Sequence, residues 1–590
     1  MHRIRAITAQ VSACSGRPDV VERSEAERDS FQRTVMSYRM GIERLLADGT
    51  VPTMTGFDLA LAGNAEGWVR VDRNEDVGLL LDQAERERTL GPLEVLPGPW
   101  KDAKTREEKI AVVQRVLFAE QTGSNVYLFA EWQMQYGGRG LDSNIAVPVI
   151  TNHSFGINAK PRLMSRVILC DAEDSLRISH MHVQKEPNFK PVLLDGIIAT
   201  DDNDFWRLQR KQLSEAFLPL SSLAKIMPKS RSRAKACAAR LQYLASSGPV
   251  DMSDFLLHEA QAQLQLALLG APEEVTEELN ERLRSGFMGD PSRAKPGDVG
   301  GAMQRLTAIA ENQPFTLPSD GSVHGPLWAA VKSSGLGPGT NFGNVLLILF
   351  AGHDTTGHTM TWMIFELARH PDIQRELRQE VSAFFTSLED RDPEYTDLKT
   401  LDLMDRCITE TLRMWPAVPN GTFRQLHFDE TVKGPDGNPA VLPKGTLVNI
   451  SNWARHRNRN LWGADADTFN PHRIWQVGEV AHVGCPLAGI TPESSRFSPF
   501  AHSPRSCLGR NFAQMEMRLI MLYILRDFEF FLAPPFDSLA GKELGPLAGP
   551  RDFRGVNRGT MGPMDIERFD ERKKPWYAMK MRVERVSCAS

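Results

Sequence analysis

Apolar residues are most densely clustered in the second half of the chain, where their spacing predicts a series of helices. Residues 341–369 form a long, mostly apolar segment that ends shortly before Pro371, whose ring disfavours helical geometry in the residue before it. This length exceeds that of an ordinary globular helix and indicates one helix that crosses the whole molecule. The next segment has apolar residues every three or four positions, at Ile373, Leu377, Val381 and Phe384. This spacing places them on one face and predicts a second, amphipathic helix.

Shorter patterns add further helices and a small amount of sheet. A helix is predicted at 403–415, and strands separated by glycine and proline are predicted within 423–450. Directly after Cys507, a helix with a buried face is predicted from apolar residues that alternate by four and three: Leu508, Phe512, Met515, Leu519 and Leu522. Residues 579–583 alternate between apolar and charged side chains, which is typical of a half-buried strand. The chain is therefore expected to be mainly α with minor β.

The first part of the chain differs from the rest in composition. Residues 1–95 are rich in charge and show only patchy amphipathic patterns, and the stiff, turn-forming sequence Leu96-Pro97-Gly98-Pro99 follows them. We predict an amino-terminal extension of unknown role over 1–95 and one large domain over 96–590. No run of about 18 apolar residues is present, so the sequence predicts no membrane-spanning helix. Residues 1–17 carry arginines but lack the apolar core of a secretory signal, which leaves an organellar address or a polar tail.

Composition and charge argue against several classes of protein. The 590 residues are 41% hydrophobic and 24% charged, which is ordinary for a globular protein. The formal net charge of −5 provides no basic surplus for a nucleic-acid partner. The seven cysteines are dispersed, odd in number and without a CxxC pair, which argues against a zinc ribbon and a disulfide framework. A reducing compartment fits this pattern best.

One cysteine lies in a sequence suited to chemistry. Cys507 follows a proline-bearing loop that starts at Phe500, it precedes the predicted helix, and Arg505 lies two residues before it. The free N–H groups at a helix start and a nearby cation both lower a thiol pKa and favour the thiolate, the form that binds metals or attacks electrophiles. The alternative is a small buried residue at a helix start, without a chemical role.

Polar residues interrupt the long apolar helix near its middle. The sequence 351–356 contains Gly352, which costs about 1 kcal/mol relative to alanine inside a helix. Asp354 and Thr355 also compete with the helix for backbone hydrogen bonds. A kink or a satisfied polar patch is one explanation of this segment, and a functional site is the other.

Two further pairs have the spacing of one helical face. Glu410 and Arg413 place an acid and a base three residues apart, a spacing shared by many exposed ion pairs of little energetic value. Trp206 and Arg210 lie one turn apart after an acidic turn, and both donate hydrogen bonds that suit carboxylates. The alternative for the second pair is a helix start with an exposed arginine.

Taken together and in this chain order, these sequences resemble the motifs of the cytochrome P-450 family. The Cys507 loop resembles the family's haem-binding signature Phe-x-x-Gly-x-Arg-x-Cys-x-Gly, with Ser503 in place of the first glycine. Residues 351–356 are similar to its acid–alcohol motif, and 469–474 contain a match to its Pro-Glu-Arg-Phe segment in which two of the four residues differ. The resemblance covers about 96 to 586. It implies that 96–590 is a haem domain with the family's mainly helical fold, in which haem lies between the long helix and the Cys507 loop.

The resemblance also implies a role for each residue singled out above. Cys507 would be the proximal thiolate ligand of the iron of haem b, and Asp354 and Thr355 would organise water for proton delivery. The haem propionates would be bound by Trp206, Arg210, Arg424 and Arg505. A structural ion-pair network would hold the cysteine loop in place, formed by Glu410, Arg413 and Arg473.

The activity implied by the resemblance is that of a haem-thiolate monooxygenase, an oxidoreductase that inserts one oxygen atom of dioxygen into an apolar organic substrate. Similarity of 412–419 and 442–446 to lipid-hydroxylating branches of the family favours a fatty acid or another lipid. Electrons are expected from a separate donor, an NADPH-dependent flavin reductase or a ferredoxin. The residues outside the haem domain are too few for a reductase, and the sequence has no GxGxxG fingerprint.

Other interpretations of the sequence stay open. Within the same fold, an isomerase or dehydratase would act on lipid hydroperoxides without external electrons, and a non-catalytic protein would bind haem or sense gases. The pair Asp354 and Thr355 argues against both, because neither function needs proton delivery to bound dioxygen. A cysteine-dependent hydrolase is a further alternative. The expected location is the cytoplasm or the surface of a membrane, with organellar import as the alternative.

Overall fold

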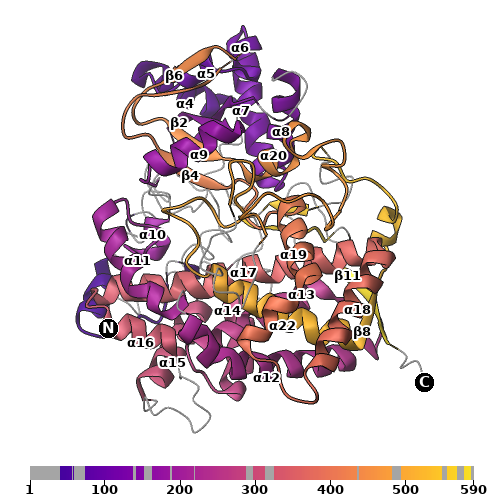
Figure 1. Cartoon of the computed structure of the whole chain (residues 1–590). Coiled ribbons are helices and arrows are strands. Elements are labelled where there is room, and N and C mark those ends of the chain that lie inside the picture. The colour runs from indigo at the N-terminus through magenta and orange to yellow at the C-terminus, as the bar shows by residue number, and fades with distance from the viewer. Residues whose placement is uncertain are drawn as a thin grey trace.

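The computed structural model of the chain is mainly helical, and its described residues form four small sheets, as the sequence pattern predicts. The described residues are 33, 40–55, 57–58, 74–136, 141, 143–151, 162–185, 189–217, 220–287, 295, 297–312, 325–434, 437–480, 493–547, 555–557, 559–565, 567 and 577–586. Figure 1 shows a smaller part of the molecule that carries most of the early helices and strands, and a larger part built almost entirely from helices.

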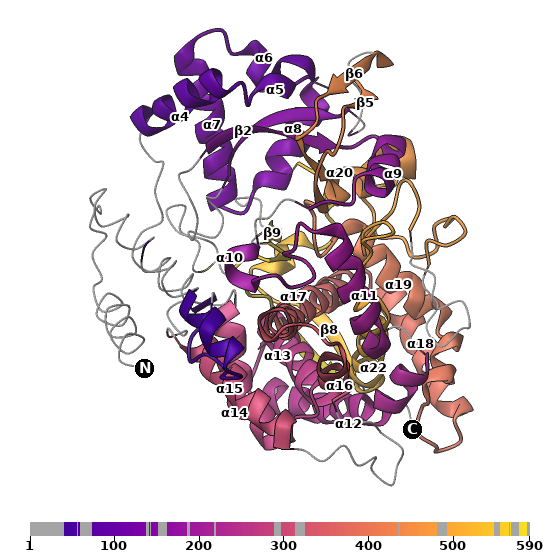
Figure 2. The ribbon, with the colours of Figure 1, turned by 90° about the vertical axis from the view of Figure 1, so that its left-hand side faces the viewer.

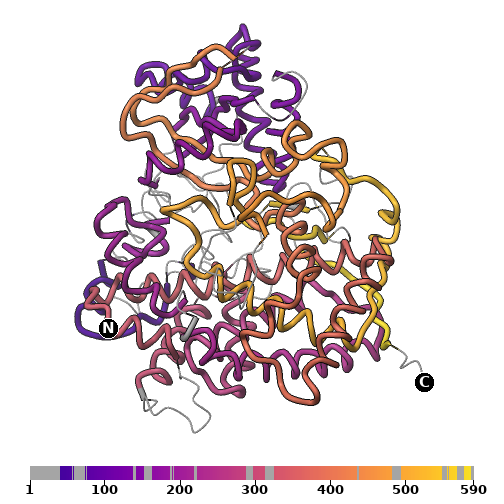
Figure 3. Tube along the Cα trace, viewed as in Figure 1, coloured from indigo at the N-terminus to yellow at the C-terminus, as the bar shows by residue number. Residues whose placement is uncertain are grey.

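The smaller part is built on a four-stranded sheet with the strand order β1–β2–β7–β4. Its strands are β1 (Ile145–Thr151), β2 (Arg162–Leu169), β7 (Leu447–Ile450) and β4 (Thr422–Gln425). β1 and β4 pair antiparallel with their neighbours, whereas β2 and β7 run parallel. Beside the sheet, β5 (Glu430–Lys433) pairs with β6 (Pro439–Leu442). The strands expected within 423–450 are therefore confirmed, and the sheet joins segments almost 300 residues apart, which lie side by side in Figure 3.

Helices from the first third of the chain pack around this sheet. They are α4 (Asn74–Glu87), α5 (Gly91–Val95), α6 (Pro99–Asp102), α7 (Arg106–Gln121), α8 (Asn125–Tyr136) and α9 (Ala172–Met181). Val77 and Leu81 of α4 belong to the same hydrophobic cluster as Leu163 and Val167 of β2. Helix α4 thus packs against the large domain although it precedes residue 96. The division between an extension and a haem domain at that point stays a prediction.

The larger part surrounds one long central helix, α17 (Pro338–Arg369), which Figure 2 shows nearly end-on. The helices that precede it are α10 (Lys190–Leu193), α11 (Asn203–Phe217), α12 (Leu220–Ala245), α13 (Met252–Gln263) with the π-helical turn η1 (Leu264–Leu268), α14 (Glu273–Phe287), α15 (Asp298–Asn312) and α16 (Pro326–Ser333). Those that follow it are α18 (Pro371–Ser387), the 3₁₀ turn η2 (Tyr395–Thr400), α19 (Asp402–Met414), α20 (Asn452–Arg457), α21 (Arg459–Trp462), α22 (Arg510–Asp527) and the 3₁₀ turn η5 (Phe536–Leu539). The helices expected at 341–369, 373–384, 403–415 and after Cys507 are all confirmed.

Local chemistry explains how α17 stays helical through its polar middle. Pro338 occupies the first turn, where its missing N–H has no partner to lose, and Pro371 begins the next helix. The hydroxyls of Thr355, Thr359 and Thr361 each donate to the carbonyl four residues earlier, at 2.8 Å, so these side chains are satisfied within the helix. At Gly357 a Cβ would come within 2.9 Å of the Leu257 Cα, so the glycine permits close packing of α13 on α17.

Two further small sheets complete the fold beside α17. β11 (Lys580–Arg585) pairs with β8 (Phe528–Leu532) and with β3 (Val250–Asp251), which confirms the strand expected near the carboxyl end. β9 (Gly555–Asn557) and β10 (Met561–Pro563) form a short hairpin. The hairpin is tied to α17 by the Trp362 indole N–H, which donates to the Met561 carbonyl at 2.8 Å. These contacts bring the last part of the chain next to the polar middle of α17.

Candidate functional site

Cys507 lies in a loop that is held at both ends. Its N–H donates to the Phe500 carbonyl at 2.7 Å, and α22 begins three residues later at Arg510. Left-handed backbone occurs in this loop at Ala501 (φ 60°) and not at Ser503, so serine at 503 causes no strain of that kind. The Cys507 residue is accessible to solvent, yet burial within the protein is the largest influence on its pKa. The sulfur is therefore crowded by protein atoms but keeps contact with solvent, so it is open to a ligand.

Burial raises the pKa of the Cys507 thiol, which corrects the prediction that its position lowers it. The thiolate is favoured by the Gly509 N–H and by three nearby cations, but these effects are smaller than desolvation: Arg510, Arg210 and Lys185. The prediction was wrong because the sequence shows the helix start and the cation but does not show how deeply the sulfur is enclosed. A metal ion coordinated at the sulfur would favour the thiolate and oppose this effect of burial.

One face of α17 is accessible in the stretch where the rest of the helix is buried. Besides Phe350, which lies on another side of the helix, the partly accessible residues of 348–355 are Ile348, Ala351, Gly352 and Thr355. Their spacing of three, four and seven positions places them on a single helical face. The face is apolar except for the Thr355 hydroxyl, which donates to the Ala351 carbonyl. It is suited to an apolar group that needs one polar contact.

Asp354 is directed away from that face. Its carboxylate accepts a hydrogen bond from the Thr560 hydroxyl at 2.5 Å, and the His358 imidazole lies next to both. Asp354 and Thr355 are adjacent in sequence and therefore about 100° apart around the helix. The structure thus places the two members of the expected acid–alcohol pair on different sides of α17.

Arg424, on β4, is a buried cation with little to neutralise it. Its side chain is fully buried. Among the described residues, Nη1 has a hydrogen bond, to the Phe423 carbonyl, and Nε and Nη2 have none. Burial lowers the pKa of this guanidinium to about 9. A buried donor group without an acceptor is costly, so Arg424 is a strong indication of an anionic ligand.

Arg424 belongs to a group of cations around the cysteine loop. Arg505 stacks on the Trp206 ring, with 4.1 Å between the guanidinium carbon and the ring centroid, and Arg210 donates to the Ser506 carbonyl at 2.6 Å. Burial and then repulsion by its neighbours lower the pKa of Arg505 to about 9. Within the described part of the chain, no carboxylate forms an ion pair or hydrogen bond with the cations of this group: Lys185, Arg210, Arg424 and Arg505.

Lys185 is the member of this cation group that sequence reasoning missed. Burial lowers its pKa well below the usual value, Arg424 and Arg505 lower it further, and Cys507 has the opposite effect. Its neighbour Val183 accepts a hydrogen bond from Arg505 Nε through its carbonyl. Nothing in the local sequence distinguishes Lys185 from a surface lysine, so its position depends on contacts with distant segments.

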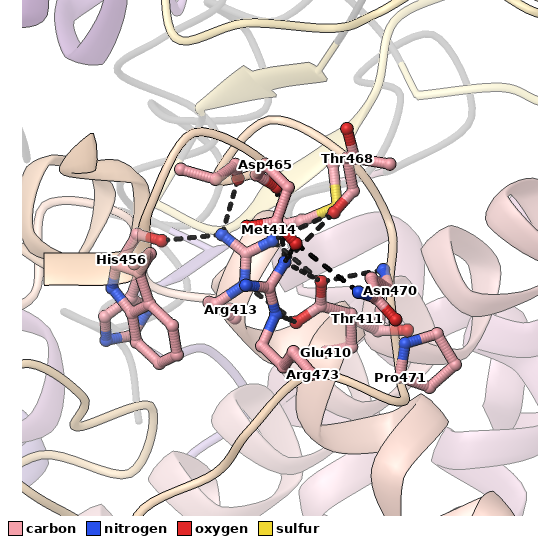
Figure 4. A network of polar contacts seen from close by, with 12 residues as sticks. Glu410, Thr411, Arg413, Met414, His456, Asp465, Thr468, Asn470, Pro471 and Arg473 are labelled. Carbon is pink, nitrogen blue, oxygen red and sulfur yellow. Dashed lines mark hydrogen bonds and ion pairs between the residues drawn. The ribbon is translucent and has the colours of Figure 1, made fainter.

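Glu410, Arg413 and Arg473 meet in the buried network that Figure 4 shows. Glu410 accepts two hydrogen bonds from Arg413 at 2.7 and 2.8 Å and two from Arg473, both at 2.9 Å. Arg413 also donates to the carbonyls of His456 and Ala466, at 2.9 and 2.6 Å. All three charged side chains are almost fully buried. The acid joins α19 to the segment that precedes the cysteine loop.

Comparison with known proteins identifies the fold that carries this site. A family model described as Cytochrome P450 matches residues 340–542, which include α17, the Glu410 network and Cys507. In this region the chain is similar to proteins of the cytochrome P450 family. This agrees with the expected fold class and with the order of the motifs.

The cytochrome P450 relatives match a limited region. Cytochrome P450 4F8 of Homo sapiens is 35% identical over 180 residues, which are 30% of this chain and 32% of that protein. The ultra-long-chain fatty acid omega-hydroxylase of Homo sapiens is 33% identical over 180 residues, 30% of this chain and 31% of that protein. Cytochrome P450 monooxygenase sphH of Aspergillus fumigatus is 33% identical over 226 residues, 38% of this chain and 39% of that protein. The matched regions thus span only about a third of these relatives' lengths.

The residues present fit the haem that cytochromes P450 bind. Cys507 offers a sulfur that is open to a ligand, and two nitrogens of Arg424 that have no acceptor among the described residues are suited to a carboxylate. The cation group around the loop would neutralise the two propionates of haem b, whose charge is opposite. Among the described helices, none is long and apolar enough to cross a membrane.

Proposed function

We propose that this chain is a haem-thiolate monooxygenase that inserts one oxygen atom of dioxygen into an apolar organic substrate. The observation that carries the proposal is a solvent-accessible cysteine beside a group of cations with which no carboxylate of the described residues pairs. The similarity of residues 340–542 to the cytochrome P450 family supports it. Haem b, when bound, would supply the activation of dioxygen and the oxidation of the substrate.

The side chains of this protein divide the remaining work. Cys507 would ligate the iron, and Arg210, Arg424 and Arg505 would bind the propionates, with Trp206 supporting Arg505 by stacking. Ile348 and Ala351 would present apolar surface on the accessible face of α17, and this surface would exclude water from the bound haem and substrate. Thr355 would place a hydroxyl at this face, and Asp354 would hold the proton that is delivered there. The Glu410 network would fix the segment before the cysteine loop.

For the substrate we propose a fatty acid or a related lipid. The accessible face of α17 is apolar, and one relative carries the name ultra-long-chain fatty acid omega-hydroxylase. Two electrons must be supplied for each dioxygen, since the substrate provides only two of the four needed to reduce it. We propose that a separate flavin reductase or ferredoxin delivers them.

The spectrum of the reduced, carbon-monoxide-bound protein tests the ligation. The purified chain, loaded with haem, is expected to show the red-shifted Soret band of a thiolate ligand, because sulfur donates strongly to iron. Cys507→Ser is expected to lose this band, whereas substitution of the buried Cys407, which lies on α19, is expected to keep it. An unchanged band in the Cys507 variant would overturn the assignment.

Turnover separates monooxygenation from the alternative on lipid hydroperoxides. Dodecanoic acid with NADPH and a reductase is expected to give a hydroxylated product that contains one atom of labelled dioxygen. Faster conversion of an added fatty-acid hydroperoxide without any reductase would instead identify an isomerase or dehydratase.

A further inference from the structure

A buried polar cluster joins α17 to the bend of the β9–β10 hairpin. Thr560 Oγ1 donates to Asp354 Oδ2 at 2.5 Å. His358 Nδ1 lies 3.3 Å from the same hydroxyl and 3.4 Å from Asp354 Oδ1. Asp354 and His358 are four residues apart and therefore share a helical face, while Thr560 comes from a segment 206 residues later in the chain. All three side chains are buried.

The hydrogen positions in this cluster follow from what each group can donate. An ionised carboxylate only accepts, so the single hydroxyl hydrogen of Thr560 is directed at Asp354. The Thr560 oxygen then has only acceptor capacity left for His358. His358 must therefore carry a hydrogen on Nδ1, which makes the imidazole the donor end of a directed chain from His358 through Thr560 to Asp354.

The surroundings hold the cluster rigidly. Tyr577 donates to the Thr560 carbonyl at 2.8 Å, and its ring packs edge-on against His358 with 4.3 Å between centroids. A Cβ at Gly562 would lie 2.6 Å from His358 Nε2, so only glycine leaves room for the imidazole. His358 is fully buried, whereas the Tyr577 ring that packs against it is only half-buried. The hairpin thus fixes the donor end of the chain against α17.

We propose that His358 and Thr560 are positioning residues that load Asp354 with the proton it delivers, an inference that rests on the proposed function. A proton from solvent first converts His358 to the imidazolium. The Nδ1–H bond of His358 then breaks as Thr560 Oγ1 gains that hydrogen, and the original hydroxyl hydrogen passes to Asp354 Oδ2. The positive imidazolium and the negative carboxylate become two neutral groups, so charge balances without electrons or another reactant.

Loading reverses the hydrogen bonds of the cluster. The proton now lies on Asp354 Oδ2, so this oxygen donates to Thr560 Oγ1, and Thr560 donates to Nδ1 of the neutral His358. Delivery of the proton then requires the Asp354 side chain to turn toward Thr355 and the accessible face of α17.

Among the ionisable groups around His358, Asp354 favours its protonation, whereas burial of the imidazole opposes it. Asp354 lies on the same helical face and stabilises the imidazolium. Tyr577 faces His358 from the opposite element and is neutral at ordinary pH. His353, on α17 itself, stays neutral, because burial lowers its pKa to about 4.

Nuclear magnetic resonance of histidine-labelled holoprotein tests the cluster without turnover. The reduced, carbon-monoxide-bound form is diamagnetic, and the His358 signals are those lost in His358→Gln. We expect the Nδ1–H tautomer, and we expect Asp354→Asn to lower the His358 pKa by about one unit. An Nε2–H tautomer, or an unchanged pKa in the Asp354 variant, would overturn the proposal.

Turnover of dodecanoic acid with NADPH and a reductase tests the relay. Thr560→Val is expected to lower the product formed per NADPH by about tenfold, the lower range of proton-transfer effects. The matched control is Thr361→Val, which removes a buried hydroxyl from α17 but touches none of the cluster. It is expected to stay within about twofold of the unaltered protein. His358→Gln keeps a hydrogen-bond donor but cannot ionise. It is therefore expected to flatten the pH profile of product formation around neutral pH.

These results separate the inference from the proposed function. The relay would be contradicted if the Thr560 and Thr361 variants formed equal amounts of product per NADPH. It would also be contradicted if the pH profile of product formation were unchanged in His358→Gln. Failure of the unaltered protein to oxidise any lipid would count against the proposed function. In that case the tautomer and the His358 pKa still decide whether the cluster is built as described.

Discussion

At the scale of single residues, the most informative feature is charge without a partner. A folded protein rarely keeps a buried guanidinium short of acceptors, because desolvation is costly. Arg424 has two such nitrogens, and no carboxylate of the described residues pairs with the neighbouring Lys185. The cost is explained if the native form contains an anionic group that the described residues do not supply.

Arg424→Leu should therefore have opposite effects on the two forms of the protein. We expect the affinity for haem to fall by about tenfold, since one charge-assisted hydrogen bond to a propionate is lost. The haem-free protein should become more stable, because an uncompensated buried charge is removed. Haem titration and urea unfolding measure the two effects.

The control for this variant is Arg424→Lys, which keeps the charge but not the planar donor set. It should lose less haem affinity than the leucine variant and gain no stability without haem. If the leucine variant binds haem as tightly as the unaltered protein, Arg424 does not contact the cofactor.

At the scale of elements, the Glu410 network decides how the segment before the cysteine loop is held. One carboxylate receives four hydrogen bonds from two arginines, which joins α19 to residues far along the chain. A buried ion pair adds little net stability compared with apolar packing, but removal of one partner leaves charges unpaired. The network is therefore better understood as fixing one geometry than as adding stability.

Glu410→Gln should destabilise the fold by about 3–5 kcal/mol, because two buried guanidinium groups lose their common anion. Chemical unfolding monitored by circular dichroism measures this loss. Asp82→Asn is the matched control, since it breaks the exposed ion pair with Arg106 and should cost less than about 1 kcal/mol. Similar losses in both variants would show that burial of the network has no energetic consequence.

At the scale of the whole molecule, several buried histidines make the fold sensitive to acid. Burial lowers the pKa of His353 to about 4, of His502 to about 3, and of His456 well below its usual value. They lie on α17, in the cysteine loop and on α20, respectively. In the unfolded chain each imidazole would accept a proton near pH 6.5, whereas the folded protein resists it.

The free energy of unfolding should therefore fall as the pH drops from about 6.5 toward 4. The unfolded state binds more protons in this range, so acid favours unfolding. The difference of about 2.5 pKa units at His353 corresponds to roughly 3 kcal/mol. His353→Gln should remove that part of the pH dependence in urea titrations, whereas substitution of the exposed His180 should not. A pH dependence equal in both variants would contradict the assignment.

Part of the site could be predicted before the fold was known, because its signals are local. The spacing of apolar residues predicts α17 and α22, and the loop around Cys507 carries its own motif. The expectation for the thiol pKa had the wrong direction, since Arg505 and the helix start are visible in sequence while enclosure of the sulfur is not. Thr560 carries no local signal either, as its role depends on a contact with Asp354 206 residues away.

The sequence alone determined the helical class, the order of the elements and the identity of the reactive loop, because periodicity and turn chemistry act over a few residues. The tertiary structure alone decided which charges are buried without partners and which side of α17 each polar group occupies. Desolvation and hydrogen-bond satisfaction depend on every segment packed around a group. Lys185, Arg424 and Thr560 acquire their meaning only when those segments meet.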